Sequence, residues 1–341
     1  TLSSSSAASD VYKRQIIVAD DKKYPRTSKN PKHAFAFKTV LDDQIVESKV
    51  VNVIWSPSKD GYLKPKVQIQ PVKLGGAVIQ YATLHNAEFV IKNKIGLGAV
   101  VQIIRSGDVI PKVEKVIKPA SNIKMPTEYE FKWNSTKKDL ILINSEDNDI
   151  VKLKKYDDFF NKLDVVGLGR GNIQRIMNAG FKTIPQILTM TIQDFMKVEG
   201  FKEKMSTKVY NSIHKKLDDV SLPNLMAASN IFGRGLGTKR IIAIIDEYPD
   251  ILTSKENNKE KLNKILQIDG FKDKTAMLFI PYIPKFIMFL KDIKQTDKLN
   301  QQVIKNVDKS HPLYNKKIII TGFRDKELQQ NLENIGVKLG T

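Results

Sequence analysis

The sequence predicts a multidomain α+β protein in which a small antiparallel β-barrel precedes a larger helical region. Residues 61–113 carry short runs in which apolar and polar residues alternate, and Gly-Gly, Asn and Gly-Asp turns separate these runs. This pattern is typical of a small closed barrel. Residues 163–290 instead repeat a glycine turn followed by an amphipathic helix, four times. The two patterns predict one barrel domain and one helical domain.

The composition favours a polyanionic partner. The 341 residues leave room for two or three domains, and 56 Lys and Arg against 37 Asp and Glu give a net charge of +19. Such a surplus points to nucleic acid, although an AT-rich genome that favours lysine codons is an alternative cause. The chain has no cysteine, which excludes disulfides and cysteine-based metal sites and fits a reducing compartment. No apolar run is long enough for a transmembrane helix, so we expect a cytoplasmic protein.

The four repeated turns lie in residues 165–180, 198–213, 230–245 and 268–283. Each resembles a helix-hairpin-helix motif, in which glycines let backbone N–H groups at a helix N-terminus face a phosphate. One such turn also joins ordinary helices, whereas four on a basic chain favour DNA binding. The turns with two glycines, at 167–169 and 235–237, are the better phosphate candidates, and the other two are expected to pack the core through Phe201 and Phe271. The DNA-binding candidates are Gly167, Gly169, Arg170, Gly200, Lys202, Gly235, Gly237, Lys239, Gly270 and Lys272.

The individual residues of the barrel segment are more specific than its alternating pattern. ATLHNAE at 82–88, followed by IGLGAVVQIIRSGDVIPKV at 95–113, resembles the OB-fold domain of NAD-dependent DNA ligases. The resemblance implies that Arg105 lies against DNA beside the nick and that Val109 and Ile110 face the minor groove. It also implies that Lys59 replaces an arginine at a phosphate contact, with a looser grip because lysine lacks the bidentate fork. His85 and Asn86 are expected to be structural, with His85 buried.

A second resemblance concerns HAFAFK at 33–38, where alternation predicts a strand with Lys38 on the face opposite the phenylalanines. The ligase family closes its nucleotidyltransferase domain with such a strand, and the match implies that Lys38 approaches the AMP phosphate of the NAD-derived adenylate. The alternative is a lysine that faces solvent. The family's nucleophilic lysine, in K-x-D-G, has no counterpart. Lys59 precedes Asp60 and Gly61, but this segment follows HAFAFK instead of preceding it, so we predict no catalytic residue here.

The family's order of domains predicts the organisation of the chain. Residues 119–150 lack the four cysteines of a zinc module and are expected to form a β-hairpin from residues 129–133 and 139–144. Residues 311–341, with a buried strand at 318–320 and a Thr-Gly turn, resemble the start of a BRCT domain. The expected parts are a non-native or disordered leader (1–15), the end of the nucleotidyltransferase domain (16–44), the OB-fold (45–118), a zinc-free linker (119–150), four helix-hairpin-helix motifs (151–291), a linker (292–310) and a truncated BRCT domain (311–341).

The resemblance implies a fragment of an enzyme that seals nicks between 5′-phosphate and 3′-hydroxyl during replication and repair, at the nucleoid or a viral replication site. The family takes AMP from NAD onto a lysine, passes it to the 5′-phosphate and uses Mg²⁺ when the 3′-hydroxyl displaces it. We expect this piece to be a monomer without zinc, to clamp nicked duplex DNA, to reach a protein or DNA partner through its BRCT segment, and to be inactive alone. A non-catalytic repair scaffold is the alternative. A nuclease would need clustered carboxylates, which do not stand out.

Overall fold

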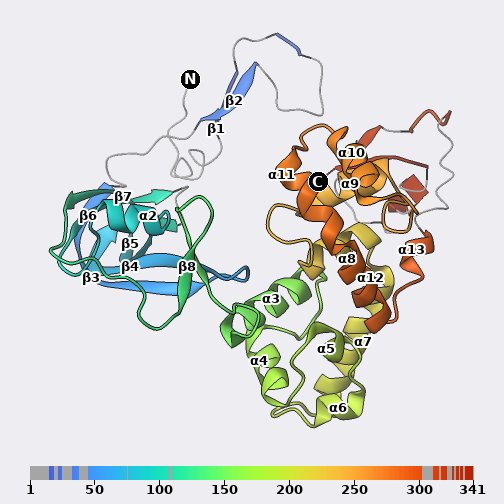
Figure 1. Cartoon of the computed structure of the whole chain (residues 1–341), viewed down its shortest axis with the longest axis horizontal. Helices are drawn as coiled ribbons and strands as arrows, with labels where there is room; N and C mark the ends of the chain where they lie inside the picture. The colour runs from blue at the N-terminus through green and yellow to red at the C-terminus, as the bar shows by residue number, and fades with distance from the viewer. Residues whose placement is uncertain are drawn as a thin grey trace. The chain divides into compact units, whose positions relative to one another are not determined.

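The chain forms two compact units in this computed structural model, and the division falls between Val151 and Lys152. Figure 1 shows the elements of both units along the chain. Within the described part, no helix is long and apolar enough to cross a membrane. The predicted leader up to residue 14, the Thr321-Gly322 turn and residues 302–309 of the predicted linker lie outside the described residues. The structure describes residues 15–18, 22–24, 33–37, 45–74, 76–106, 110–301, 310–314, 316–320, 325, 328–329, 331–332 and 335–340.

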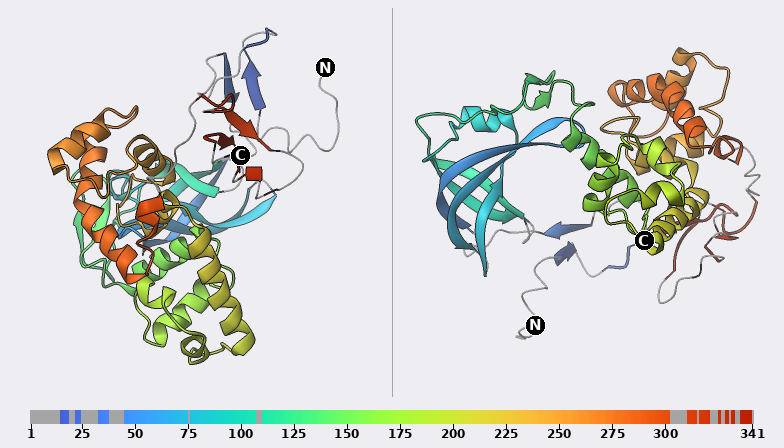
Figure 2. Two further views of the ribbon diagram at one scale, coloured as in Figure 1. Left: turned by 90° about the vertical axis from the view of Figure 1, so that its right-hand side faces the viewer. Right: turned by 90° about the horizontal axis from the view of Figure 1, so that it is seen from below.

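Five strands of the first unit close into a barrel, with the order β3-β6-β7-β5-β4 and a further pairing of β3 with β4. All neighbours are antiparallel except β5 and β7, which pair in parallel through Thr83 and Lys112. This is the strand order of an OB-fold, and the predicted barrel is confirmed (Figures 1 and 2). A short helix, α2, joins β5 to β6. The bounds are β3 Ile45–Pro57, β4 Tyr62–Leu74, β5 Ala77–Thr83, α2 Ala87–Lys92, β6 Val100–Ser106 and β7 Ile110–Lys118.

Alternation along the strands fills the barrel. In β4, Leu63, Val67 and Ile69 are buried, while the lysines between them are half-buried on the outer surface. Asn86 caps α2, because its Oδ1 accepts a hydrogen bond from the backbone N–H of Phe89 at 2.8 Å. Its structural role is therefore confirmed. His85 is exposed and packs edge-on against the Phe89 ring, so the expectation of a buried histidine is wrong.

The cysteine-free segment forms a two-stranded hairpin as predicted, from β8 (Phe131–Trp133) and β9 (Leu140–Leu142). Strand β9 also pairs with β4, so the hairpin extends the barrel sheet. Leu140 and Leu142 are buried in the barrel core. The chain after β9 lies close to the β3–β4 turn at Gly61, where φ is +75° and an added Cβ would lie 2.6 Å from the Ser145 Cβ. Apolar burial and strand pairing thus hold this segment against the barrel.

The second unit is a helical domain with one continuous apolar core. Phenylalanines fill much of it, among them Phe159 and Phe289, whose rings contact each other edge-on. The core extends to Ile293, and the buried Lys298 donates hydrogen bonds to the backbone oxygens of Asp218 and Val220 at 3.1 and 2.8 Å. The helices are α3 Asp149–Lys162, α4 Arg170–Asn178, α5 Ile184–Leu188, α6 Ile192–Met196, α7 Glu203–Asp219, α8 Leu222–Ser229, α9 Thr238–Glu247, α10 Asn258–Leu266, α11 Asp273–Phe279, α12 Ile283–Asp292 and α13 Lys298–Gln301, with a 3-10 turn at Ile280–Tyr282.

Two small sheets lie outside these cores. Strands β1 (Gln15–Val18) and β2 (Ala34–Phe37) pair antiparallel, as the alternation in HAFAF predicts for β2. Strands β10 (Lys317–Ile319) and β11 (Lys338–Gly340) pair in parallel. Ile319 is 55% exposed and Ile318 is half-buried, so the prediction of a buried strand is wrong. Two paired strands cannot cover both of their own faces, and burial would need further layers.

Candidate nucleic-acid interface

A helix precedes and follows each of the four glycine turns, and each turn has the same internal design. Gly167, Gly200, Gly235 and Gly270 have φ of +92°, +78°, +106° and +85°, the left-handed region that favours glycine. The next residue in each turn packs into the core, and these residues are Leu168, Phe201, Leu236 and Phe271. The predicted packing by the two phenylalanines is confirmed, but the leucines of the other two turns have the same role. Core packing therefore does not distinguish the turns.

The helix starts do distinguish them. Gly169 and Gly237 are the N-cap residues of α4 and α9, and neither helix has a side-chain cap or an acidic residue in its first turn. Both glycines are exposed, with extended backbone (φ −77° and −80°) and no atom within 4 Å of an added Cβ. They do not set a special backbone angle. They leave the N–H groups and the positive dipole end of each helix open to an anion.

Helices α7 and α11 begin differently. Their N-cap residues are the exposed Lys202 and Lys272, and an acidic residue follows at once, Glu203 in α7 and Asp273 in α11. A carboxylate in the first turn stabilises the dipole end and repels a phosphate. The turns containing Gly200 and Gly270 therefore offer a lysine charge beside a helix start that is already compensated.

The basic side chains of the turns differ in their contacts and their exposure. Arg170 makes a two-pronged ion pair with Asp157 of α3, with Nε and Nη2 at 2.9 and 2.8 Å from Oδ2. This pair ties the two helices of the first turn together. Lys239 is exposed at the start of α9. Arg175 was not predicted, yet it is exposed on α4, and an added Cβ on Gly200 would lie 3.2 Å from its Nη1. Arg175 thus brings a charge of the first turn beside the second, and its place on the helix that follows this turn is the only sequence signal.

The barrel presents lysines interleaved with aromatic rings on the outer side of β4 and β5. The Lys66 ammonium lies 4.9 Å from the centre of the Tyr81 ring, and Lys64 lies 5.4 Å from that of Tyr62. Tyr81 is 44% exposed. This combination can bind phosphates through the ammonium groups and bases or sugars through the rings. Sequence analysis missed these residues, although their alternation in YLKPK at 62–66 places both lysines on one face.

The predicted DNA contacts of the barrel occupy two loops. Lys59 is half-buried in the turn between β3 and β4. Arg105 is half-buried in β6 opposite Pro111, and Ile110 is 57% exposed at the start of β7. Val109, the rest of the Gly107–Val109 turn and Lys38 lie outside the described residues, so the structure brings Arg105 and Ile110 to one loop without placing their neighbours.

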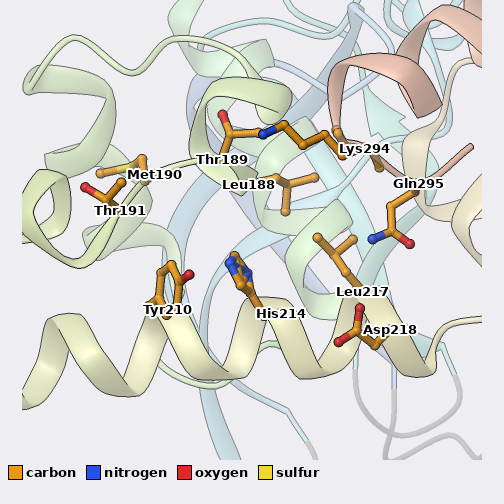
Figure 3. Close-up of a pocket in the computed structure, with 11 residues that line it drawn as sticks. Leu188, Thr189, Met190, Thr191, Tyr210, His214, Leu217, Asp218, Lys294 and Gln295 are labelled. Carbon is orange, nitrogen blue, oxygen red and sulfur yellow. The ribbon is translucent and has the colours of Figure 1, made fainter.

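A cavity of about 320 Å³ opens in the helical unit between the α5–α6 loop, α7 and the segment that follows α12. Tyr210 and His214 lie side by side on α7, with ring centres 4.0 Å apart, and Lys294 extends toward Thr189 (Figure 3). Asp218 supplies an opposite charge at the rim. Nearby, burial lowers the pKa of Lys298, and Asp218 and Asp219 oppose that shift. None of the four glycine turns lines the cavity, so it is separate from the helix starts described above.

The described residues contain no cluster of three or more His, Asp or Glu side chains that could hold a metal ion.

Comparison with known proteins gives the following similarities. Residues 47–124 match the NAD-dependent DNA ligase OB-fold domain. A DNA ligase of Acanthamoeba polyphaga mimivirus is 38% identical over 327 residues, which are 95% of this chain and 51% of that protein. A DNA ligase of Ruthia magnifica subsp. Calyptogena magnifica is 29% identical over 322 residues, 90% of this chain and 50% of that protein. The chain thus spans about half the length of these curated relatives, and the resemblance predicted from residues 82–113 is confirmed.

Proposed function

We propose that this chain is the DNA-clamping part of an NAD-dependent DNA ligase, and that it holds nicked duplex DNA through its phosphates. The observation that carries the proposal is the OB-fold barrel, which matches this ligase family and presents Lys64 and Lys66 beside aromatic rings. The uncapped starts of α4 and α9 support it, as does the net charge of +19. Each feature binds anions without reading bases.

The helical unit would contribute as an array of four helix-hairpin-helix motifs. In this proposal the turns ending at Gly169 and Gly237 bind phosphates directly, through backbone N–H groups at helix N-termini. The turns ending at Lys202 and Lys272 add ammonium charges at longer range, because Glu203 and Asp273 already compensate their helix dipoles. The tandem array would follow the backbone of the duplex on both sides of a nick.

The chemical step would rest on Lys38. Residues 34–37 form strand β2 as predicted, and the continuation of that strand would place Lys38 on the face opposite Phe35 and Phe37. There its ammonium would stabilise charge on the AMP phosphate that NAD supplies. The lysine nucleophile and the Mg²⁺ ligands would come from outside the described residues. Alone, the chain would bind DNA and seal nothing.

The last segment would be the start of a BRCT domain that reaches a protein or DNA partner. The support is the parallel pairing of β10 and β11, with helical residues 328–329 and 331–332 between them. A strand–helix–strand unit with parallel strands is how such an α/β domain would begin.

The test is nick sealing by the chain joined to an adenylation core that carries a K-x-D-G lysine. A fluorescent nicked duplex should become sealed with NAD and not with ATP, and the core without this chain should fail at the same concentration. Sealing by the core alone at an equal rate would remove the clamping role. A joined protein that binds DNA and never forms the lysine–AMP adduct from NAD would favour a non-catalytic scaffold.

A further inference from the structure

The β8–β9 hairpin carries three lysines whose side chains make no ion pair within the described residues. Lys132 lies in β8, and Lys137 and Lys138 lie in the turn, where all three are exposed. Within the described ranges none of them forms an ion pair with an acidic group. The acidic residue beside them, Asp139, is instead paired with Lys64 of the barrel at 3.1 Å. The tip of the hairpin therefore has uncompensated positive charge.

Hydrogen bonds to the Asn134 side chain and to α2 hold the tip in one conformation. The Oδ1 atom of Asn134 accepts hydrogen bonds from the N–H groups of Lys138 and Asp139, at 3.0 and 3.2 Å, and from the hydroxyl of Thr136 at 3.1 Å. Lys137 has a φ of +54°, which is uncommon for a residue other than glycine. The backbone N–H of Glu88 donates to the carbonyl of Lys138 at 3.1 Å and fixes the tip to α2. The lysine side chains thus start from an ordered backbone.

The hairpin is also aligned with the barrel surface. Leu140 and Leu142 point into the core, so the residue between them, Ile141, points outward. Ile141 pairs with Lys132 on one side and with Tyr62 on the other, and cross-strand partners share a face. Lys132 therefore lies on the same outer surface as Tyr62, and that surface continues along β4 to Lys64 and Lys66.

We propose that this hairpin is a DNA-backbone contact, in which Lys132, Lys137 and Lys138 bind phosphates of the duplex that the barrel holds. The inference rests on the proposed function, because the continuous surface is the one assigned to DNA there. A strand-paired extension of the barrel lengthens that surface without a separate domain. The hairpin would thus take a direct part in binding as well as extending the barrel sheet.

The test compares two double substitutions. Lys137→Gln with Lys138→Gln removes two charges from the tip, and Lys115→Gln with Lys118→Gln removes two exposed charges from β7, which β5 and β4 separate from the hairpin. Binding of a labelled nicked duplex is measured by anisotropy from about 0.05 to 0.3 M salt. Each lost phosphate contact should make the slope of log K against log[salt] less negative by about 0.9, so the tip variant should change it by about 1.8 and the β7 variant by about zero. The affinity of the tip variant at about 0.1 M salt should fall by roughly 50-fold.

A tip variant with wild-type slope and affinity would refute the hairpin contact alone. A wild-type chain that does not bind the duplex at all would refute the proposed function together with it.

Discussion

Adding a carboxylate at Gly169 or Gly237 should separate stability from DNA binding. Both residues are N-caps with backbone angles that any residue adopts, and an added Cβ at either meets no atom within 4 Å. Gly169→Asp would cap α4 and complement its dipole, which should raise the free energy of unfolding by about 0.5 kcal/mol. The same carboxylate would occupy the position proposed for a phosphate. Stability should therefore rise while DNA affinity falls.

The expected loss follows from one phosphate contact per turn. Each substitution should weaken binding of a nicked duplex roughly tenfold at about 0.1 M salt and make the salt slope less negative by about 0.9, and the double variant should show about twice both changes in log units. Asn257→Asp is the matched control, because it adds the same charge at the N-cap of α10 while Asn257 already caps that helix. Thermal unfolding and anisotropy are measured on each protein. The reasoning fails if the glycine variants weaken binding no more than Asn257→Asp does.

Three further outcomes are expected. Leu140→Ala should lower the free energy of unfolding of the barrel unit by about 2–5 kcal/mol, and Ile141→Ala should cost far less, because Leu140 is fully buried and Ile141 is half-buried. A chelator should not move the melting temperature, because the chain has no cysteine to bind zinc, and a chelator-sensitive midpoint would contradict this. The Lys197 ammonium and the Thr191 cap lower the pKa of Asp194 to about 2. The ionised Asp194 therefore stabilises the fold above about pH 4, and this stabilisation is lost as the pH falls toward 2. Asp194→Asn should reduce the slope of melting temperature against pH in that range, and an unchanged slope would show that the Asp194–Lys197 pair does not stabilise the fold. In a protein with the adenylation core, Lys38→Ala should slow adenylyl transfer by about 10² to 10³ with DNA binding retained, and Lys38→Arg should restore little of the rate. Sealing at the wild-type rate by the Lys38→Ala variant would mean that Lys38 only faces solvent.

Much of the fold could be predicted because its signals are local. The alternation in β4 and the glycine turns at 167 and 235 depend on residues within a few positions of each other. The sequence GLG, however, does not say which glycine needs a positive φ. The positive φ falls at Gly167 and Gly235 because the next residues, Leu168 and Leu236, must turn into the core.

The parts that could not be predicted depend on distant residues. The sequence predicted Arg170 as a phosphate ligand, but in the structure it pairs with Asp157 on the preceding helix. The pairing of β9 with β4 joins residues almost eighty positions apart, and only this pairing places Lys132 on the barrel's outer surface. The exposure of Ile319 likewise depends on the layers that would cover its strand, not on the strand itself.

The most direct test of phosphate clamping is the salt dependence of binding to a nicked duplex of arbitrary sequence. With roughly 5 to 8 phosphate contacts, log K should fall linearly with log[salt] at a slope of about −4.5 to −7, and two duplexes of unrelated sequence should give the same line. A slope near zero, or tight binding that survives molar salt, would contradict the account.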